Sequence, residues 1–163
     1  MKIEFTYNEV IEFIRLYSLF KTTAEDRTLF LIEHGVIDDN SSLESAKKKY
    51  NQIIYDDLVF SRLIRNGFWE NIVRSITGNE ITILDHRDDT IKGVCCDACG
   101  YIVFENREDA FYEICPVCGW QNDGKVGDEY SSCNRCSMND FKATEDFSHR
   151  VALGDEKYIL SSK

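Results

Sequence analysis

Four cysteines in two closely spaced pairs constrain this chain more than any other feature of its sequence. Two residues separate Cys96 from Cys99, two separate Cys115 from Cys118, and fifteen residues lie between the pairs. The spacing C-x2-C-x15-C-x2-C is typical of a four-thiolate metal site, because each pair supplies two ligands from one tight turn. We therefore predict that Cys96, Cys99, Cys115 and Cys118 bind one metal ion.

A glycine follows each pair, at positions 100 and 119. Glycine adopts positive φ without steric cost, so we expect these turns to direct backbone N–H groups toward the sulfurs. A closed shell of four sulfurs suits zinc in a structural role, and zinc is favoured over iron. The alternatives to a metal are redox dithiols or disulfides, which the paired spacing in a reducing compartment disfavours.

A third pair, Cys133 and Cys136, has the same C-x-x-C spacing, and fourteen residues separate Cys133 from Cys118. Three interpretations are open: a redox pair, substitute metal ligands, or two spare thiols in a loop. Spare thiols are favoured, because the other four cysteines already complete a tetrahedral shell. The remaining Cys95 is expected to face away from Cys96 along a strand and to pack.

The charge balance of the chain is acidic, with 29 Asp and Glu against 19 Lys and Arg and a net charge of −10. Residues 1–90 carry 11 basic and 16 acidic residues and residues 91–163 carry 8 and 13, so each part is at −5. Phosphate contacts need clustered basic residues, which argues against nucleic acid as a partner. An acidic surface instead favours a basic protein partner.

The chain shows the sequence profile of a cytoplasmic protein. The start, residues 1–5, has a glutamate where a signal peptide has a long apolar run. Nothing approaches the roughly 18 consecutive apolar residues of a membrane span. All seven cysteines lie between positions 95 and 136, which in a reducing cytoplasm indicates metal binding rather than a disulfide framework.

The first 78 residues have the apolar periodicity of helices. Thr6 and Glu9 form a capping-box pattern for the first helix, and Gly35 is a stop signal for the second. Two more helices are predicted before Gly78, of which the first is long. The predicted helices after the first are 25–34, 43–66 and 68–76.

From residue 80 onward the pattern changes to short strands. Strands are predicted at 80–84, 101–104 and 111–114; the second leaves the first cysteine turn and the third enters the second turn, so that these two form a hairpin. Ser137 and Asp140 resemble a capping box for a final helix over about 138–150.

We predict an α+β fold of two domains, divided at the polar connector 86–90. Residues 1–90 form a mainly helical domain. Residues 91–163 form a small rubredoxin-like, zinc-ribbon β module with a C-terminal helix.

The segment Tyr112–Trp120, which reads Tyr-Glu-Ile-Cys-Pro-Val-Cys-Gly-Trp, resembles the cysteine-rich CPCC family of small bacterial proteins. Cys96, Cys99 and Gly100 match the first turn of that family, and the resemblance covers residues 94–142. It implies a zinc-binding module without an assigned activity. After Trp120 the family has Glu-Asp-Asp, whereas this chain has residues 121–123 as Gln-Asn-Asp.

Both cysteine turns also resemble the knuckles of rubredoxins, which use iron in a four-cysteine site for electron transfer. In rubredoxins the second pair lies much farther along the chain than fifteen residues. The knuckle is shared by many structural zinc ribbons, so this resemblance alone leaves the metal open between zinc and iron.

Catalytic patterns are weak in this sequence. The histidines, His34, His86 and His149, form no H-E-x-x-H pair, and the adjacent acid pairs do not face a common site on a helix. We therefore expect no enzymatic activity and no catalytic residues.

Small size, acidity and a helical part beside a common ribbon lead to a binding hypothesis. We expect an immunity or antitoxin-like protein that neutralises a basic nuclease toxin by masking it with an acidic face. The alternatives are a rubredoxin-type iron electron carrier and a stand-alone zinc-ribbon regulatory protein.

Overall fold

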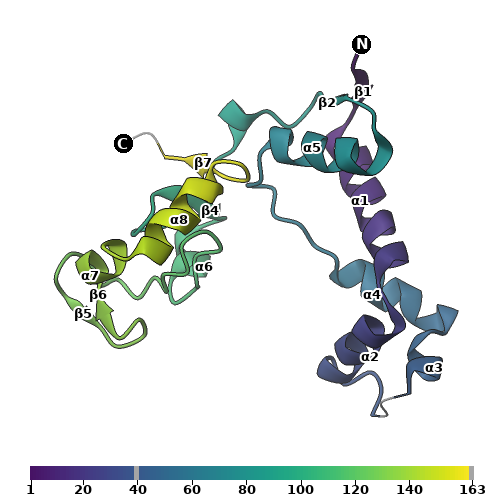
Figure 1. Ribbon diagram of the computed structural model, residues 1–163, viewed down its shortest axis with the longest axis horizontal. Coiled ribbons are helices and arrows are strands. Elements are labelled where there is room, and N and C mark those ends of the chain that lie inside the picture. Colours follow the sequence, from purple (N-terminus) through teal and green to yellow (C-terminus); the bar gives the residue numbers. More distant parts are fainter. Residues whose placement is uncertain (39–40, 162–163) are drawn as a thin grey trace. The chain divides into compact units, whose positions relative to one another are not determined.

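Figure 1 shows the computed structural model of the chain, which describes residues 1–38 and 41–161. These residues pack into two compact units. We call residues 5–60 the helical unit, and residues 1–4 together with 61–163 the cysteine unit. The predicted mixed α+β class is confirmed. The predicted domain boundary near residue 90 lies inside the cysteine unit, and independent folding of residues 91–163 stays a prediction.

The helical unit begins with two capped helices. Helix α1 (Tyr7–Lys21) starts at the predicted capping box, in which Thr6 and Glu9 satisfy each other's backbone N–H groups. Helix α2 (Ala24–Glu33) starts with a second capping box, and Gly35 follows it with φ of 64°. The positive φ explains why a glycine ends this helix.

The long helix predicted over 43–66 is wrong. The structure has α3 (Ser42–Ser45), a 3-10 turn η1 (Lys48–Tyr50) and α4 (Asn51–Asp57). In a continuous helix the Ser45 carbonyl would accept from residue 49, but here it accepts from Arg27 Nε at 3.0 Å. The Ser45 hydroxyl also accepts a hydrogen bond from the Thr28 hydroxyl at 2.7 Å. Such side-chain bonds compete with the helix and end it early.

Part of the core of the helical unit is a small apolar cluster. Its members come from α2, the segment after it, η1 and α4. They are Leu31, Ile37, Tyr50 and Ile54.

The first part of the cysteine unit is a helix beside a two-stranded sheet. Helix α5 (Asn66–Thr77) ends at Gly78, whose φ is 77°, in line with the predicted helix over 68–76. Strand β2 (Ile81–Ile83) follows and pairs with β1 (Ile3–Phe5). The polar connector after β2 forms a 3-10 turn, η2 (Asp88–Thr90), and Asp88 accepts from the first backbone N–H of α5 at 3.1 Å.

The segment with the four predicted metal ligands contributes to a three-stranded antiparallel sheet. Strands β3 (Val94–Cys95), β4 (Tyr101–Phe104) and β7 (Ile159–Leu160) are ordered β3-β4-β7. The predicted strand over 111–114 is wrong: helix α6 (Arg107–Ala110) is followed by Tyr112 at φ of 66°, a left-handed conformation that breaks a strand. Ile114 retains a single bridge to Gln121.

The last part contains a hairpin and two helices. Strands β5 (Tyr130–Ser131) and β6 (Cys136–Ser137) form the hairpin, and Ser137 caps α7 (Met138–Lys142) as predicted. The predicted helix over 138–150 is broken, because Thr144 caps a new helix, α8 (Glu145–Gly154). Across residues 1–38 and 41–161, no helix combines the length and apolarity needed to cross a bilayer.

Candidate metal centre

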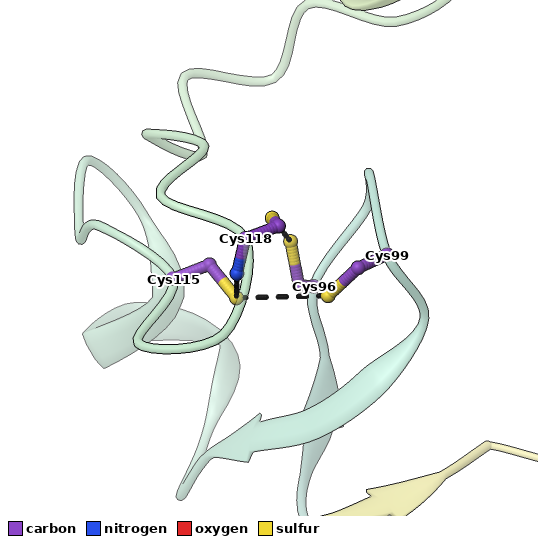
Figure 2. A group of neighbouring side chains, drawn as sticks. All are labelled: Cys96, Cys99, Cys115 and Cys118. Atoms are coloured by element: carbon purple, nitrogen blue, oxygen red, sulfur yellow. Dashed lines mark hydrogen bonds between the residues drawn. The ribbon is translucent and has the colours of Figure 1, made fainter. Parts of the chain in front are cut away.

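The structure brings the four predicted cysteines together in one cluster. Their Sγ atoms all lie within 4.8 Å of one another. The closest pairs join one turn to the other, Cys96 to Cys118 at 3.7 Å and Cys99 to Cys115 at 3.6 Å (Figure 2). The two segments that are fifteen residues apart in sequence therefore converge on one point.

The sulfur separations fit a tetrahedral metal ion. With metal–sulfur bonds of about 2.3 Å, a tetrahedron has sulfur–sulfur edges of about 3.8 Å. The two closest separations, 3.6 and 3.7 Å, are near this value. A disulfide needs about 2.05 Å between its sulfurs. The four side chains are therefore arranged to hold one metal ion rather than two disulfides.

The two turns have the same backbone hydrogen bonds, and we call them knuckle 1 (96–100) and knuckle 2 (115–119). In each, the first cysteine donates its N–H to the carbonyl five residues later, and the closing glycine donates to the carbonyl of the first cysteine. The four donor–acceptor distances lie between 2.8 and 2.9 Å. Gly100 and Gly119 have φ of 80° and 84°. The prediction of positive φ after each pair is confirmed.

Backbone N–H groups point at sulfur in knuckle 2, as expected, and they belong to residues before the closing glycine. In knuckle 2 the donors are Val117 and Cys118, whose nitrogens lie 3.4 and 3.5 Å from Cys115 Sγ. The glycine N–H is already bonded to a carbonyl. Because N–H dipoles stabilise negative sulfur, knuckle 2 is built to hold Cys115 as a thiolate.

Burial separates one ligand from the other three. Cys96, Cys115 and Cys118 are each 1% exposed, whereas Cys99 is partly exposed. Trp120, directly after knuckle 2, is fully buried and packs on Phe141 with ring centroids 5.2 Å apart. The four ligand groups themselves are all buried, so the centre is a closed site.

Helix α8 covers both knuckles through a close backbone approach. A Cβ built on Gly154 would lie 2.7 Å from Val117 Cγ1 in knuckle 2 and 2.8 Å from the Tyr101 ring. The Tyr101 hydroxyl, just after knuckle 1, donates to the Val151 carbonyl of α8 at 3.0 Å. Only glycine allows this approach without a shift, so position 154 is part of how the centre is assembled.

The pKa values of the cysteines reflect their crowding. Hydrogen bonds from Cys118, and then from Cys96 and Cys99, hold the pKa of Cys115 well below that of an ordinary thiol. The pKa of Cys99 is raised, first by its hydrogen bond with Cys115 and then by Cys118, Cys96 and burial. The pKa of Cys118 is also raised, first by its hydrogen bond with Cys115, so Cys99 and Cys118 favour the protonated form. A divalent cation would displace those protons, so metal binding is coupled to proton release.

The other three cysteines lie outside the four-sulfur cluster. Cys95 lies on β3 opposite Ile102, Cys133 is exposed in the β5–β6 turn, and Cys136 Sγ lies 3.4 Å from the Asn134 carbonyl. Of the three interpretations of Cys133 and Cys136, the redox pair and the spare thiols both stay open.

Asn122 connects the two knuckles, a role that was not predicted from the sequence. It is buried, its Oδ1 accepts from the Asp97 N–H of knuckle 1 at 3.2 Å, and its Nδ2 donates to the Glu113 carbonyl at 3.2 Å. A single asparagine gives no sequence signal of this kind. The only hint was its place two residues after Trp120, where this chain departs from the family pattern.

Asn134 also holds the end of knuckle 2 from the β5–β6 turn. Its Oδ1 accepts from the Gln121 N–H and its Nδ2 donates to the Gln121 carbonyl, both at 2.9 Å. The hairpin therefore supports the backbone directly after Trp120.

Comparison with known proteins agrees with this geometry over part of the chain. No curated protein and no solved structure is similar enough to the chain to be matched. A family model does match, and it spans both knuckles, the β5–β6 hairpin, α7 and α8 almost to its end. Residues 94–153 match the model of the Cysteine-rich CPCC family, as the resemblance predicted.

Proposed function

We propose that the four-cysteine centre holds zinc in a structural role. Four protein sulfurs complete a tetrahedral shell and leave no open position for a substrate. The strands around the centre have two to four residues each, too short for a stable sheet by themselves. The observation that most directly supports this proposal is the closed set of four converging sulfurs. Iron in a rubredoxin-type site is the second candidate, because all-thiolate shells accept both metals.

Metal analysis tests this proposal. We expect the purified chain to contain one zinc per molecule and to be colourless. Stoichiometric iron with visible sulfur-to-iron absorption would replace the structural role with electron transfer. A chain that binds neither metal would remove both candidates.

For the whole chain we propose protein binding rather than catalysis, in the manner of an immunity or antitoxin-like protein. The proposed partner is a basic toxin domain, such as a nuclease, which the chain masks with an acidic face. The net charge of −10 supports this, because attraction to a basic partner speeds association. Repulsion between the acidic chain and phosphates disfavours nucleic acid as a ligand. We also propose a cytoplasmic location and no membrane partner. Among the seven cysteines, all of them described, none forms a disulfide, which suits a reducing compartment.

The surroundings of two histidines support binding over catalysis. His34 Nδ1 lies 2.8 Å from the Phe30 carbonyl at the end of α2. His86 is buried, with its ring nitrogens 2.7 Å from Asn66 Oδ1 and 2.7 Å from the Arg62 carbonyl. Both rings hold local structure together, as expected for residues that stabilise rather than react.

Capture from the native cell lysate tests the binding role. The tagged chain is immobilised at low salt, and bound proteins are identified by mass spectrometry. We expect one basic protein in near-equal amount, released by high salt and inhibited by the chain in its own assay. The absence of a stoichiometric partner would contradict the inhibitor role and favour a stand-alone zinc protein.

A further inference from the structure

Three large apolar side chains beside knuckle 2 are turned outward rather than buried. Phe111, Tyr112 and Ile114 are 55, 55 and 61% exposed. The Phe111 and Tyr112 rings contact each other edge to face, with centroids 4.3 Å apart. We call these three residues the aromatic platform. Grouped exposed apolar residues of this kind mark interaction sites, whereas single ones do not.

The platform is held in place by the backbone beneath it. Tyr112 has φ of 66°, and its N–H donates to the Asn122 carbonyl at 2.7 Å while its carbonyl accepts from Gln121 Nε2 at 2.8 Å. Asn122 also donates its N–H to the Glu113 carbonyl at 3.0 Å. The left-handed conformation is thus fixed from two sides, and it directs a tyrosine outward at a position that favours glycine or asparagine.

Knuckle 2 adds a second support. Ile114 immediately precedes Cys115, and its bridge partner Gln121 directly follows Trp120. The Ile114 end of the platform is therefore attached directly to knuckle 2. A surface already ordered in the free protein loses little conformational entropy on binding, which favours tight association.

The chain on either side of the platform is strongly acidic. Residues 105–129 contain seven acidic and two basic residues, so this stretch of 25 carries half of the chain's net charge. Six of the acids are exposed and the seventh is half-buried. They are Glu105, Glu108, Asp109, Glu113, Asp123, Asp128 and Glu129.

Aromatic rings with carboxylates around them match one side chain best. The planar guanidinium of arginine stacks on aromatic faces and bonds carboxylates through two parallel N–H groups, which lysine cannot do. We propose that the aromatic platform and its acidic surround form the docking surface for an arginine-rich face of a protein partner. This inference rests on the proposed binding function and specifies where the partner docks and by what chemistry.

The test uses a fluorescently labelled nona-arginine peptide and a nona-lysine peptide with the full-length, metal-loaded chain. The platform variant combines Phe111→Ser, Tyr112→Asn and Ile114→Thr. Asparagine tolerates the left-handed φ and threonine suits the bridge, so the fold should be retained. The control variant, Leu43→Ser with Val59→Thr, changes two side chains that are even more exposed but lie in the helical unit.

We expect the native chain to bind the arginine peptide more tightly than the lysine peptide. The platform variant should bind it at least about tenfold more weakly, as expected when an aromatic anchor is removed, and the control should bind as the native chain does. Equal affinity of the platform variant and the native chain, or no binding by either, would overturn the inference. Metal content checks that the cysteine unit of each variant is folded, and far-UV circular dichroism checks the helical unit.

A second variant tests the acidic surround without touching the apolar residues. Glu105, Glu108, Glu113 and Glu129 are changed to glutamine, and the matched control changes four exposed glutamates elsewhere, Glu4, Glu12, Glu33 and Glu156. The two glutamine variants have the same net charge. A weaker affinity for the arginine peptide in the first variant alone therefore supports a docking surface at the platform. Equal weakening in both shows a general charge effect and contradicts the docking surface.

The lysate capture separates this inference from the function on which it rests. If the native chain and the platform variant retain the same basic partner equally, the docking surface is wrong while the binding function stands. If the native chain retains no basic partner, the function fails, and the peptide measurements still decide whether the platform recognises arginine.

Discussion

The helical unit and the cysteine unit reach stability by different means. The helical unit buries an apolar cluster of four residues and begins two helices with full capping boxes. The cysteine unit has sheets of only two or three short strands, and its most buried side chains include three thiols. Loss of the metal should therefore unfold one unit and spare the other, which separates the two contributions to stability.

The largest expected effect comes from removing two metal ligands. Cys99→Ser with Cys118→Ser should abolish metal binding and unfold the cysteine unit, because zinc binding supplies about 10 kcal/mol or more to small sites of this kind. Both tryptophans, Trp69 and Trp120, lie in this unit. Their fluorescence should therefore shift to that of exposed indole, while far-UV circular dichroism retains the signal of the helical unit.

The control for this pair is Cys95→Ser with Cys133→Ser, which should leave metal content at one per chain. Two results would contradict this difference between the units. The Cys99/Cys118 variant could keep its metal and its melting temperature, or its helical unit could unfold together with the cysteine unit.

A smaller effect is expected from Gly154→Ala on α8. The added methyl group would meet Val117 and a Tyr101 ring that is fixed by its hydrogen bond to Val151. We expect a loss of about 1–3 kcal/mol in the free energy of unfolding, the usual effect of overpacking. Denaturant unfolding followed by tryptophan fluorescence measures it.

Gly67→Ala is the matched control for this substitution. A Cβ at Gly67 meets nothing within 4 Å, and the residue lies in α5. This change should stabilise the protein by about 0.5–1 kcal/mol. Equal changes in the free energy of unfolding for Gly154→Ala and Gly67→Ala would show that α8 does not pack closely on the knuckles.

Asn122→Ala should weaken the link between the knuckles. It removes the acceptor for the Asp97 N–H and the donor to the Glu113 carbonyl, at a buried position. The expected cost is about 1–3 kcal/mol, and metal affinity should fall with it. Competition with a chelator measures the affinity. Asn139→Ala, which removes an exposed bond to Asp128, should change little and serves as the control.

The smallest expected effect is in the helical unit and depends on pH. Lys47, and then Lys49 and Tyr50, hydrogen-bond Glu44 and lower the pKa of its carboxyl to about 2. A lowered pKa in the folded state contributes stability that is present above pH 4.5 and is lost as pH falls toward 2. Glu44→Gln should remove this acid-dependent loss, measured by circular dichroism of the helical unit. An unchanged acid transition would show that the carboxylate contributes nothing.

Local sequence signals predicted the parts of the fold that local bonds determine. Thr6 with Glu9, and Ser137 with Asp140, mark helix starts because a cap involves only residues three apart. The four cysteines and their glycines predicted the cluster for a similar reason: each knuckle is closed by bonds within six residues.

The missed features depend on partners far along the chain. The helix over 43–66 is interrupted because Arg27, eighteen residues before Ser45, takes the carbonyl that the helix would use. Residues 111–114 do not pair with β4, because β4 is instead paired with β7 at the other end of the cysteine unit. Asn122 reaches back to Asp97, 25 residues earlier. Such contacts have no periodicity for a sequence pattern to detect.

The pairing of β7 has a consequence for how the chain folds while it is being synthesised. Beside its strand pairing with β4, the Ser161 N–H donates to the Gly100 carbonyl of knuckle 1 at 2.9 Å. The ribosome therefore releases all four ligands well before the strand that completes their sheet, whereas residues 5–60 are synthesised early and form a unit of their own. Between these two moments the four thiols would be unprotected, and early capture of a metal ion would shield them from oxidation.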